Sequence, residues 1–155
     1  MDDRLIAADI SRGVCRFFAQ QGLVALPEVP LPNGRRTDLT ALDPKGQIII
    51  VEIKVSRADL HTDSKWPDYW DWCDRFYWAL AGGLDPAILE AEAYRPDQSG
   101  LIVADRYGAA LVREAAVRPL PTARRKAEWL RLGRIAMRRQ MHAADPDLIA
   151  PLSDL

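Results

Sequence analysis

The sequence contains few residues of the kinds that build disulfide frameworks or zinc sites. Among its 155 residues there are two cysteines, Cys15 and Cys73, and two histidines, His61 and His142. Neither cysteine belongs to a CxxC pair and the histidines lie far apart, which argues against a structural zinc site. We interpret both cysteines as small buried hydrophobic residues of a reduced protein.

Long hydrophobic runs and an excess of one charge are also missing. The longest strongly apolar run, residues 48–51, is far shorter than the roughly 20 residues that span a bilayer. The acidic start MDDRLIAADI lacks the basic region of a secretory signal. With 21 Lys and Arg against 22 Asp and Glu, the net charge of -1 excludes a histone-like polycation. We therefore expect a cytoplasmic protein without a membrane segment, whose contacts with phosphate groups are local.

The composition that is present favours one compact domain. Hydrophobic residues make up 48% and charged residues 28% of the chain, enough for a full core at this length. We predict a single domain over residues 1–144 and a loose C-terminal tail over residues 145–155, beginning at Asp145 and Pro146.

The first third of the chain predicts a helix followed by a meander of strands. Apolar residues recur at helical spacing over residues 5–21, and Gly22 is a suitable residue to end that helix. Three short apolar stretches follow, separated by the turn sequences PNG and DPKG: residues 23–31, 37–42 and 47–55. This pattern predicts a three-stranded antiparallel meander.

A second helix is predicted over residues 64–82. Seven residues of this segment fall within an arc of about 120° at helical spacing: Trp66, Tyr69, Trp70, Cys73, Phe76, Tyr77 and Leu80. Trp72 and Trp78 fall outside the arc, so they are candidates for stacking on unpaired bases, with packing against the last helix or a dimer partner as the alternative.

The last third of the chain completes the predicted fold. Residues 100–104 and 109–112 are predicted as two short strands, and a last helix is predicted from an N-cap at Thr122 to about His142. The order of elements predicts an α/β fold in which a central mixed sheet, the antiparallel meander plus further strands, is flanked by helices.

Two charged residues interrupt the apolar third strand. Glu52 and Lys54 are two positions apart, so both point to one face of the strand. The turn Asp43-Pro44-Lys45-Gly46 suits a type I turn closed by a left-handed glycine, which pairs positions whose numbers sum to 90. On this register Asp38 lies opposite Glu52, with Cβ atoms about 5 Å apart.

The three side chains can be explained by metal-assisted hydrolysis. Two neighbouring carboxylates repel each other, and a divalent cation between them removes that penalty. Oxygen ligands from Asp38, Glu52 and the main-chain carbonyl of Ile53 favour Mg²⁺ or Mn²⁺ over zinc. Lys54 would position the attacking water and stabilise charge on a phosphodiester. The alternative is an internal network of ion pairs with a purely structural role.

Longer segments carry a resemblance to a known family. They are PLPNGRRTDL (residues 30–39), EIKVSRADL (52–60), KWP (65–67) and CDRFYWA (73–79). With these segments the chain resembles the MmcB-like DNA repair family, formerly a domain of unknown function, within the PD-(D/E)xK nuclease superfamily. The close resemblance covers about a third of the chain, and the order of elements covers most of the rest.

The resemblance implies a restriction-endonuclease-like core over residues 1–144, with Asp38, Glu52 and Lys54 at the catalytic positions. Thr37 stands where the proline that names the motif would be. Asp9 and Glu28 are candidate extra ligands, and the alternative is that both are solvated surface residues. The resemblance further implies DNA and other repair proteins as partners and association with the nucleoid, and a homodimer is common among resolvase-like relatives.

Basic residues supply the candidate DNA contacts. Residues 113–142 hold nine Arg or Lys and two Glu, a net charge of +7, while the remainder of the chain is net -8. Such asymmetry suits phosphate contacts by the last helix, and ion pairs with the acidic remainder are the alternative. The candidate contacts are Arg35, Arg36, Lys65, Arg124, Arg125 and Lys126. On the predicted register, Arg36 would lie opposite Lys54.

Two functions are therefore compared below. The first is a DNA repair protein that hydrolyses DNA phosphodiester bonds with Mg²⁺ or Mn²⁺, as a deoxyribonuclease. The second is a non-cleaving DNA-binding or assembly subunit of a repair complex that keeps the nuclease fold.

Overall fold

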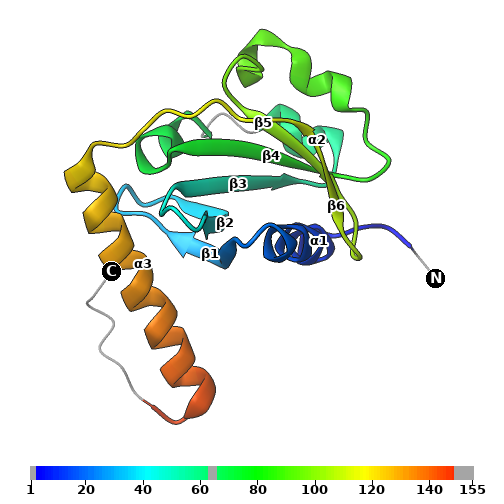
Figure 1. The fold of residues 1–155 in the computed structure, drawn as a ribbon. Helices are drawn as coiled ribbons and strands as arrows, with labels where there is room; N and C mark the ends of the chain where they lie inside the picture. The colour runs from blue at the N-terminus through cyan, green and yellow to red at the C-terminus, as the bar shows by residue number, and fades with distance from the viewer. Residues whose placement is uncertain (1–2, 63–65, 149–155) are drawn as a thin grey trace. The chain divides into compact units, whose positions relative to one another are not determined.

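The computed structural model describes residues 3–62 and 66–148. The chain divides into two compact units, Met1–Pro119 and Leu120–Leu155, and each is described by itself. The first unit contains a six-stranded sheet with helical segments, and the second contains one long helix (Figure 1).

The sheet combines antiparallel and parallel pairs. The strands lie side by side in chain order: β1 (Val24–Pro30), β2 (Arg36–Leu42), β3 (Ile48–Lys54), β4 (Arg75–Ala81), β5 (Gly100–Ala104) and β6 (Ala109–Arg113). The β1–β2, β2–β3 and β5–β6 pairs are antiparallel, while β3–β4 and β4–β5 are parallel. The predicted α/β class with a central mixed sheet flanked by helices is confirmed.

The first helix, α1 (Ala7–Gln20), begins and ends with local hydrogen bonds. The Asp9 carboxylate accepts the main-chain N–H of Ile6 at 3.0 Å, which satisfies a donor at the N-terminus. At the other end Gly22 has a φ of 78°, and the N–H groups of Gly22 and Leu23 bond back to carbonyls of the last turn. The predicted helix ending at Gly22 is confirmed.

The turn between β2 and β3 has the predicted geometry. Gly46 has a φ of 85° and donates its N–H to the carbonyl of Asp43 at 3.0 Å. The strand pairs run from Leu42 opposite Ile48 to Leu39 opposite Val51, so paired numbers sum to 90. The meander and its register are therefore confirmed.

Alternate residues of the sheet serve two different faces. Leu39, Val51 and Ala79 join the core that packs against one face of α1. The α1 side of this core consists of Ile10, Val14 and Phe18. The opposite face of β4 carries Phe76 and Trp78, whose rings contact Trp66.

The prediction of one helix over residues 64–82 is wrong. Residues 64 and 65 lie outside the described residues, and the remainder forms a 3₁₀ helix, η1 (Trp66–Trp72), followed by strand β4. Because β4 is buried on both faces, almost all of its residues are apolar, and such a run also satisfies a helical arc.

This correction changes the role of two tryptophans. Trp78 is fully buried in β4, so it is excluded as a contact for unpaired bases. Trp72 ends η1 and is half-buried. Three further short helical segments complete this part of the chain: α2 (Arg57–Thr62) precedes η1, and η2 (Pro86–Glu90) and η3 (Glu92–Tyr94) lie between β4 and β5.

The second unit contains α3 (Thr122–Ala144). Its N-cap is Pro121, whose carbonyl accepts the N–H of Arg125 at 3.0 Å, so Thr122 is the first helical residue and the prediction of Thr122 as N-cap is wrong. Pro121 adopts the extended ψ of 138° that an N-cap requires. Glu128 and Arg131 form an ion pair one turn apart within the helix. In the described parts of the chain, no helix is long and apolar enough to cross a membrane.

Candidate functional site

The predicted carboxylates meet where the β2–β3 ladder stops. The last main-chain pair is Leu39 opposite Val51. At the next position the N–H of Asp38 donates to Oε1 of Glu52 at 3.3 Å, and the N–H of Ile53 donates to Oδ2 of Asp38 at 2.7 Å. Side-chain oxygens therefore replace main-chain acceptors, and the main-chain pairing of the two strands ends at the carboxylates.

An irregularity in β1 explains why the β2–β3 ladder ends at Asp38. Glu28 of β1 has a φ of 51°, a left-handed conformation that is uncommon for a residue with a side chain. The β1–β2 pairing skips Glu28 and Asp38, although the flanking pairs follow one register. The irregularity at Glu28 thus interrupts the pairing of Asp38 with β1 and allows its N–H to contact Glu52.

Glu52 and Lys54 are held in a buried environment. Their exposed fractions are only 5% and 6%, and in the parallel register they lie beside Trp78 and Leu80 of β4. Burial of charged groups is unfavourable unless they are paired, hydrogen-bonded or bound to a cation. The site therefore concentrates unlike charges on the aromatic face of the sheet, as the strand pattern predicts.

Burial dominates the electrostatics of Asp38. Desolvation raises the pKa of its carboxyl above the ordinary value, and the hydrogen bond from Ile53, the charge of Lys54 and the contact with Glu52 oppose that rise in part. A second carboxyl nearby makes it costly to ionise both groups together. The pair therefore favours a proton or a cation between its oxygens.

Asp59 contacts Lys54 and was not identified from the sequence. Its Oδ1 lies 3.8 Å from Nζ of Lys54, and its Oδ2 accepts the N–H of Val55 at 3.3 Å. Its own N–H bonds Oγ of Ser56 at 3.1 Å. The sequence does hold a signal for this arrangement, because a serine followed three positions later by an acidic residue is typical of a helix N-terminus.

The donor set fits a hard divalent cation that keeps several water ligands. In residues 3–62 and 66–148, no group of three or more His, Cys, Asp or Glu side chains is close enough to hold a metal ion. Two carboxylates are nevertheless available, and Ile53 adds a main-chain carbonyl. Since N–H and C=O of a strand residue point to the same side, this carbonyl faces the opening next to Asp38. Mg²⁺ is commonly bound by one or two carboxylates and waters.

Asp9 and Glu28, the possible extra ligands, lie in other contacts. Asp9 caps α1, and its Oδ1 lies 3.7 Å from Nε of Arg106. Glu28 lies 3.5 Å from a guanidinium nitrogen of Arg36. The structure does not bring either carboxylate into a group with Asp38 and Glu52.

The candidate DNA contacts of the first unit take part in ion pairs. Arg35 bonds the Asp68 carboxylate at 2.9 Å. Arg36 pairs with Pro30 of β1, and the Arg36 carbonyl accepts a hydrogen bond from the Tyr69 hydroxyl at 3.1 Å. The β2–β3 pairing ends at Leu39 and Val51, so Arg36 is not paired with Lys54. Lys65 lies outside the described residues.

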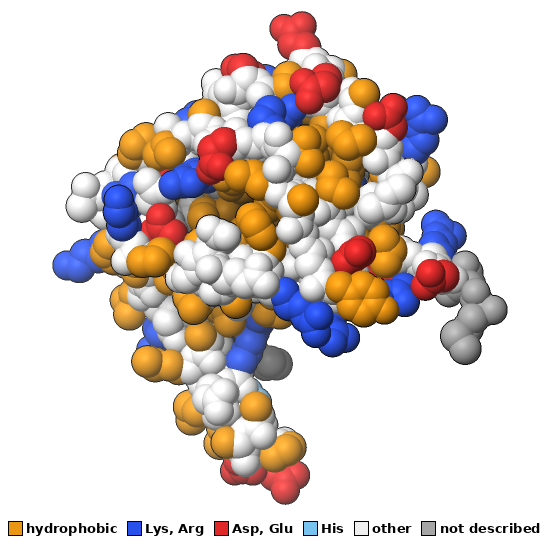
Figure 2. Space-filling view, turned by 45° about the vertical axis from the view of Figure 1, so that its right-hand side comes forward, with side chains coloured by type: hydrophobic (Ala, Val, Ile, Leu, Met, Phe, Trp, Pro, Cys, Tyr) orange, Lys and Arg blue, Asp and Glu red, His pale blue; other side chains and the backbone are white. Residues whose placement is uncertain are grey.

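Of the remaining candidates, Arg124 and Arg125 lie in the first turn of α3 and Lys126 directly follows it. Positive charge is unfavourable there because the helix dipole already makes the N-terminus positive. An anion such as phosphate would stabilise this arrangement. On the face shown in Figure 2, Lys and Arg side chains are scattered among acidic and hydrophobic ones, so that face presents no broad basic surface.

The fold and the site together define an α/β protein with a mixed sheet in which a half-buried aspartate and a buried glutamate lie beside a lysine. The chain matches the family model described as DNA repair protein MmcB-like over residues 3–147, and it belongs to that family. The family supports a role in DNA repair.

A solved structure has the same fold over almost its whole length. It is described as the SPO1766 protein of unknown function from Silicibacter pomeroyi, and it is 38% identical to this chain. The match covers 97% of this chain and 99% of that chain with a TM-score of 0.84. Comparison with curated proteins finds no match.

Proposed function

We propose that the protein is a metal-dependent nuclease of the PD-(D/E)xK type that hydrolyses DNA phosphodiester bonds during repair. This proposal rests on the contact between Asp38 of β2 and Glu52 of β3 at the point where the β2–β3 pairing ends. Lys54 lies two residues after Glu52 on β3. A structural ion pair would not require the ladder to open. An opening lined by carboxylates gives a cation and a phosphate access to the strand ends.

Each residue of this site has a defined role in the proposal. Asp38, Glu52 and the Ile53 carbonyl would hold Mg²⁺ or Mn²⁺, which when bound neutralises phosphate charge and lowers the pKa of water. The Lys54 ammonium orients the attacking water and stabilises negative charge on the phosphate oxygens. Asp59 holds the ammonium in place from α2.

DNA contacts are assigned to basic side chains near the site and on α3. Arg35 and Arg36 follow the turn that precedes β2, close in sequence to Asp38. The first turn of α3 would add phosphate contacts through Arg124, Arg125 and Lys126. Binding through such contacts weakens as salt concentration rises.

One observation favours the second candidate function, a non-cleaving DNA-binding subunit. Asp38 already accepts a main-chain N–H, and in the described residues only a pair of carboxylates meets at the opening. Such a pair can satisfy the main-chain N–H groups where the β2–β3 ladder ends, without catalysis. Cleavage assays separate the two functions.

The test uses three DNA substrates with Mg²⁺ or Mn²⁺: circular single strands, linear duplex and a four-way junction. We expect the wild type to cut at least one of them and Glu52→Ala and Lys54→Ala to cut none. Asp43→Asn, which changes an aspartate at the other end of the same hairpin, is the matched control and should cut normally. Calorimetry should show Mn²⁺ binding by the wild type and none by Glu52→Ala.

The outcome that overturns the nuclease proposal is equally clear. If no substrate is cut while DNA is bound with a steep salt dependence, the protein is a binding subunit. If Glu52→Ala binds Mn²⁺ as the wild type does, the carboxylate pair is not the metal site.

A further inference from the structure

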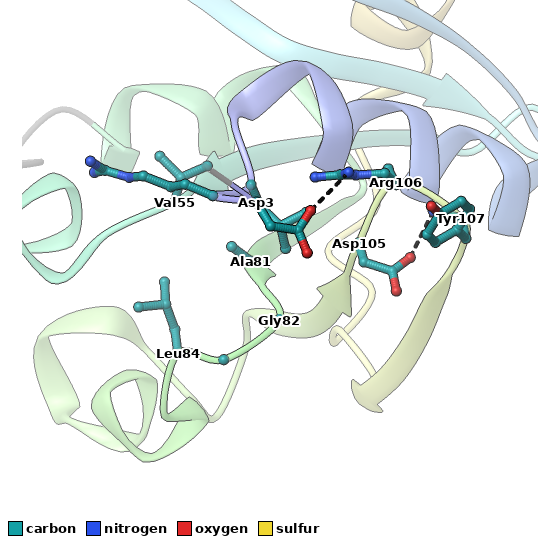
Figure 3. Close-up of a pocket in the computed structure, with 11 residues that line it drawn as sticks. Asp3, Val55, Ala81, Gly82, Leu84, Asp105, Arg106 and Tyr107 are labelled. Carbon is teal, nitrogen blue, oxygen red and sulfur yellow. Dashed lines mark hydrogen bonds and ion pairs between the residues drawn. The ribbon is translucent and has the colours of Figure 1, made fainter. Parts of the chain in front are cut away.

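A pocket of about 600 Å³ lies at the carboxyl ends of the three parallel strands (Figure 3). Val55 follows β3, Gly82 follows β4 and Asp105 follows β5, and all three line the pocket. In α/β sheets, the carboxyl ends of parallel strands are the usual place for ligands. The carboxylates Asp38 and Glu52 are not among the lining residues, so the pocket is separate from the candidate metal site.

The inner wall of this pocket is apolar and its rim is polar. Leu5, Val55 and Leu84 line it and also pack against the hydrophobic core. Tyr107 stands at the rim with an exposed fraction of 72%. Pockets of roughly 300–1,000 Å³ with an apolar lining and a few polar groups are typical of small-molecule sites. A flat aromatic group of nucleoside size fits this description.

The pocket carries no excess of positive charge. The Asp3 carboxylate lies 3.1 Å from the Arg106 guanidinium, as drawn in Figure 3, and the Asp9 carboxylate lies 3.7 Å from Nε of the same guanidinium. Asp105 and Arg4 add one charge of each sign to the lining. Because no excess of positive charge remains, a phosphate group gains little here. A neutral ring does not have this disadvantage.

The outer wall is fixed before any ligand binds. The Asp105 carboxylate accepts the N–H groups of Tyr107 at 2.7 Å and Gly108 at 3.0 Å, and Arg16 of α1 donates to the Tyr107 carbonyl at 3.3 Å. A Cβ on Gly13 would lie 1.9 Å from the Asp105 carbonyl oxygen, so α1 packs directly against this turn. A rigid wall reduces the entropy lost on binding.

We propose that this pocket takes an unpaired nucleobase of the DNA strand that the candidate site binds. The inference rests on the proposed function and adds a feature of its substrate, a base outside the helical stack. Val55 directly follows Lys54 in the chain, so the pocket begins where the catalytic strand ends. An unpaired or mismatched base costs the least to move out of a duplex, which makes such a pocket selective for damaged or branched DNA.

Gly82 offers a way to fill the pocket without altering the fold. A Cβ at this position would meet only ordinary contacts, the Ala104 carbonyl oxygen at 3.7 Å and Cδ1 of Leu5 at 3.9 Å. Gly82→Ala adds this Cβ alone and is the matched control. Gly82→Phe places a ring beside Leu5, where the base would lie. Tyr107→Ala, at an exposed position, is a second test that does not depend on filling the pocket.

The experiment measures DNA binding in EDTA by fluorescence anisotropy. One duplex carries a single unpaired 2-aminopurine, and the other is the same duplex with that base paired. We expect the wild type and Gly82→Ala to bind the first duplex about tenfold more tightly and to change its 2-aminopurine emission. Gly82→Phe and Tyr107→Ala should reduce this preference at least threefold, with unchanged thermal unfolding temperatures.

Other outcomes overturn the proposal. Equal binding of both duplexes by the wild type, or an undiminished preference in both pocket variants, excludes a base in this pocket. Deoxyadenosine monophosphate that competes with the unpaired duplex at equal affinity would assign the pocket to free nucleotides instead of DNA. Binding is measured without metal, so it tests the pocket independently of cleavage. If the wild type prefers the unpaired duplex but cuts no DNA when metal is added, the nuclease proposal is overturned and the pocket proposal stands.

Discussion

The two ends of the β2–β3 hairpin use the same interaction in opposite ways. At the turn, Oδ1 of Asp43 accepts the N–H groups of Lys45 at 2.9 Å and Gln47 at 2.8 Å, and the main chain continues the ladder. At the far end, Oδ2 of Asp38 accepts the N–H of Ile53, and the ladder stops. The hydrogen bonds of Asp43 therefore stabilise the turn, whereas the hydrogen bond of Asp38 takes the place of a main-chain pair at the end of the ladder.

The surroundings account for this difference. Asp43 lies in a loop with exposed neighbours and no second carboxylate in contact, whereas Asp38 lies beside buried Glu52. Both aspartates are half-buried, so the difference lies in Glu52, whose carboxylate adds a second negative charge beside Asp38. We therefore expect a cation at this end of the hairpin.

The strongest test of the comparison replaces Glu52 with glutamine. This change keeps the shape of the side chain and removes the charge, so we expect DNA cleavage to fall by about 100-fold or more. Single-turnover kinetics with Mn²⁺ would measure the loss. Asp43→Asn at the other end should change the rate less than twofold, and a comparable loss there would show that the two ends are not functionally distinct.

A second test removes the acceptor at the turn. Asp43→Ala leaves the N–H groups of Lys45 and Gln47 without their side-chain partner, which should lower the free energy of unfolding by about 1–2 kcal/mol. Urea denaturation would measure this change. Cleavage at a temperature well below unfolding should be unaffected, and a selective loss of activity would contradict the assignment of a structural role.

A third test replaces the glycine whose backbone conformation the same turn requires. Gly46 has a φ of 85°, so Gly46→Ala should lower the free energy of unfolding by about 1 kcal/mol because the left-handed conformation is strained for alanine. Gly133→Ala, in the interior of α3, is a useful contrast that should be neutral or stabilising. Equal effects at both glycines would contradict the proposed turn geometry.

The smallest expected effect is a pH dependence from Asp38. Burial raises the pKa of its carboxyl in the folded protein, so folding favours the protonated form. In EDTA, stability from this group should therefore increase as pH falls through the folded pKa and level off below the unfolded pKa of about 3.9. Asp38→Asn should lack this contribution. Thermal unfolding of both proteins between neutral and acidic pH would measure it, and parallel curves would contradict it.

Local sequence signals predicted the meander and the meeting of the carboxylates. The turn residues Asp43 and Gly46 define both the loop length and the register, and the register alone places Asp38 opposite Glu52. These features depend on a few neighbouring residues. For that reason they can be predicted without knowledge of the rest of the fold.

Features that depend on distant segments could not be predicted. β4 was predicted as helix because an apolar run buried on both faces has no clear period, and only its parallel partners β3 and β5 determine that it is a strand. The opening at Asp38 depends on the left-handed Glu28 in another strand. The pocket combines the segment before α1, the carboxyl ends of β3 and β4 and the β5–β6 turn, which no local pattern connects.

The central position of β3 also has a kinetic consequence. On one side it pairs with β2 through a short turn, and on the other side it pairs in parallel with β4, which a parallel arrangement allows only after a longer crossover. Pairs close in sequence form with a smaller loss of chain entropy than pairs that require a long crossover. We therefore expect the β2–β3 hairpin to form before the parallel pairs, and β4 and β5 to add to it afterwards.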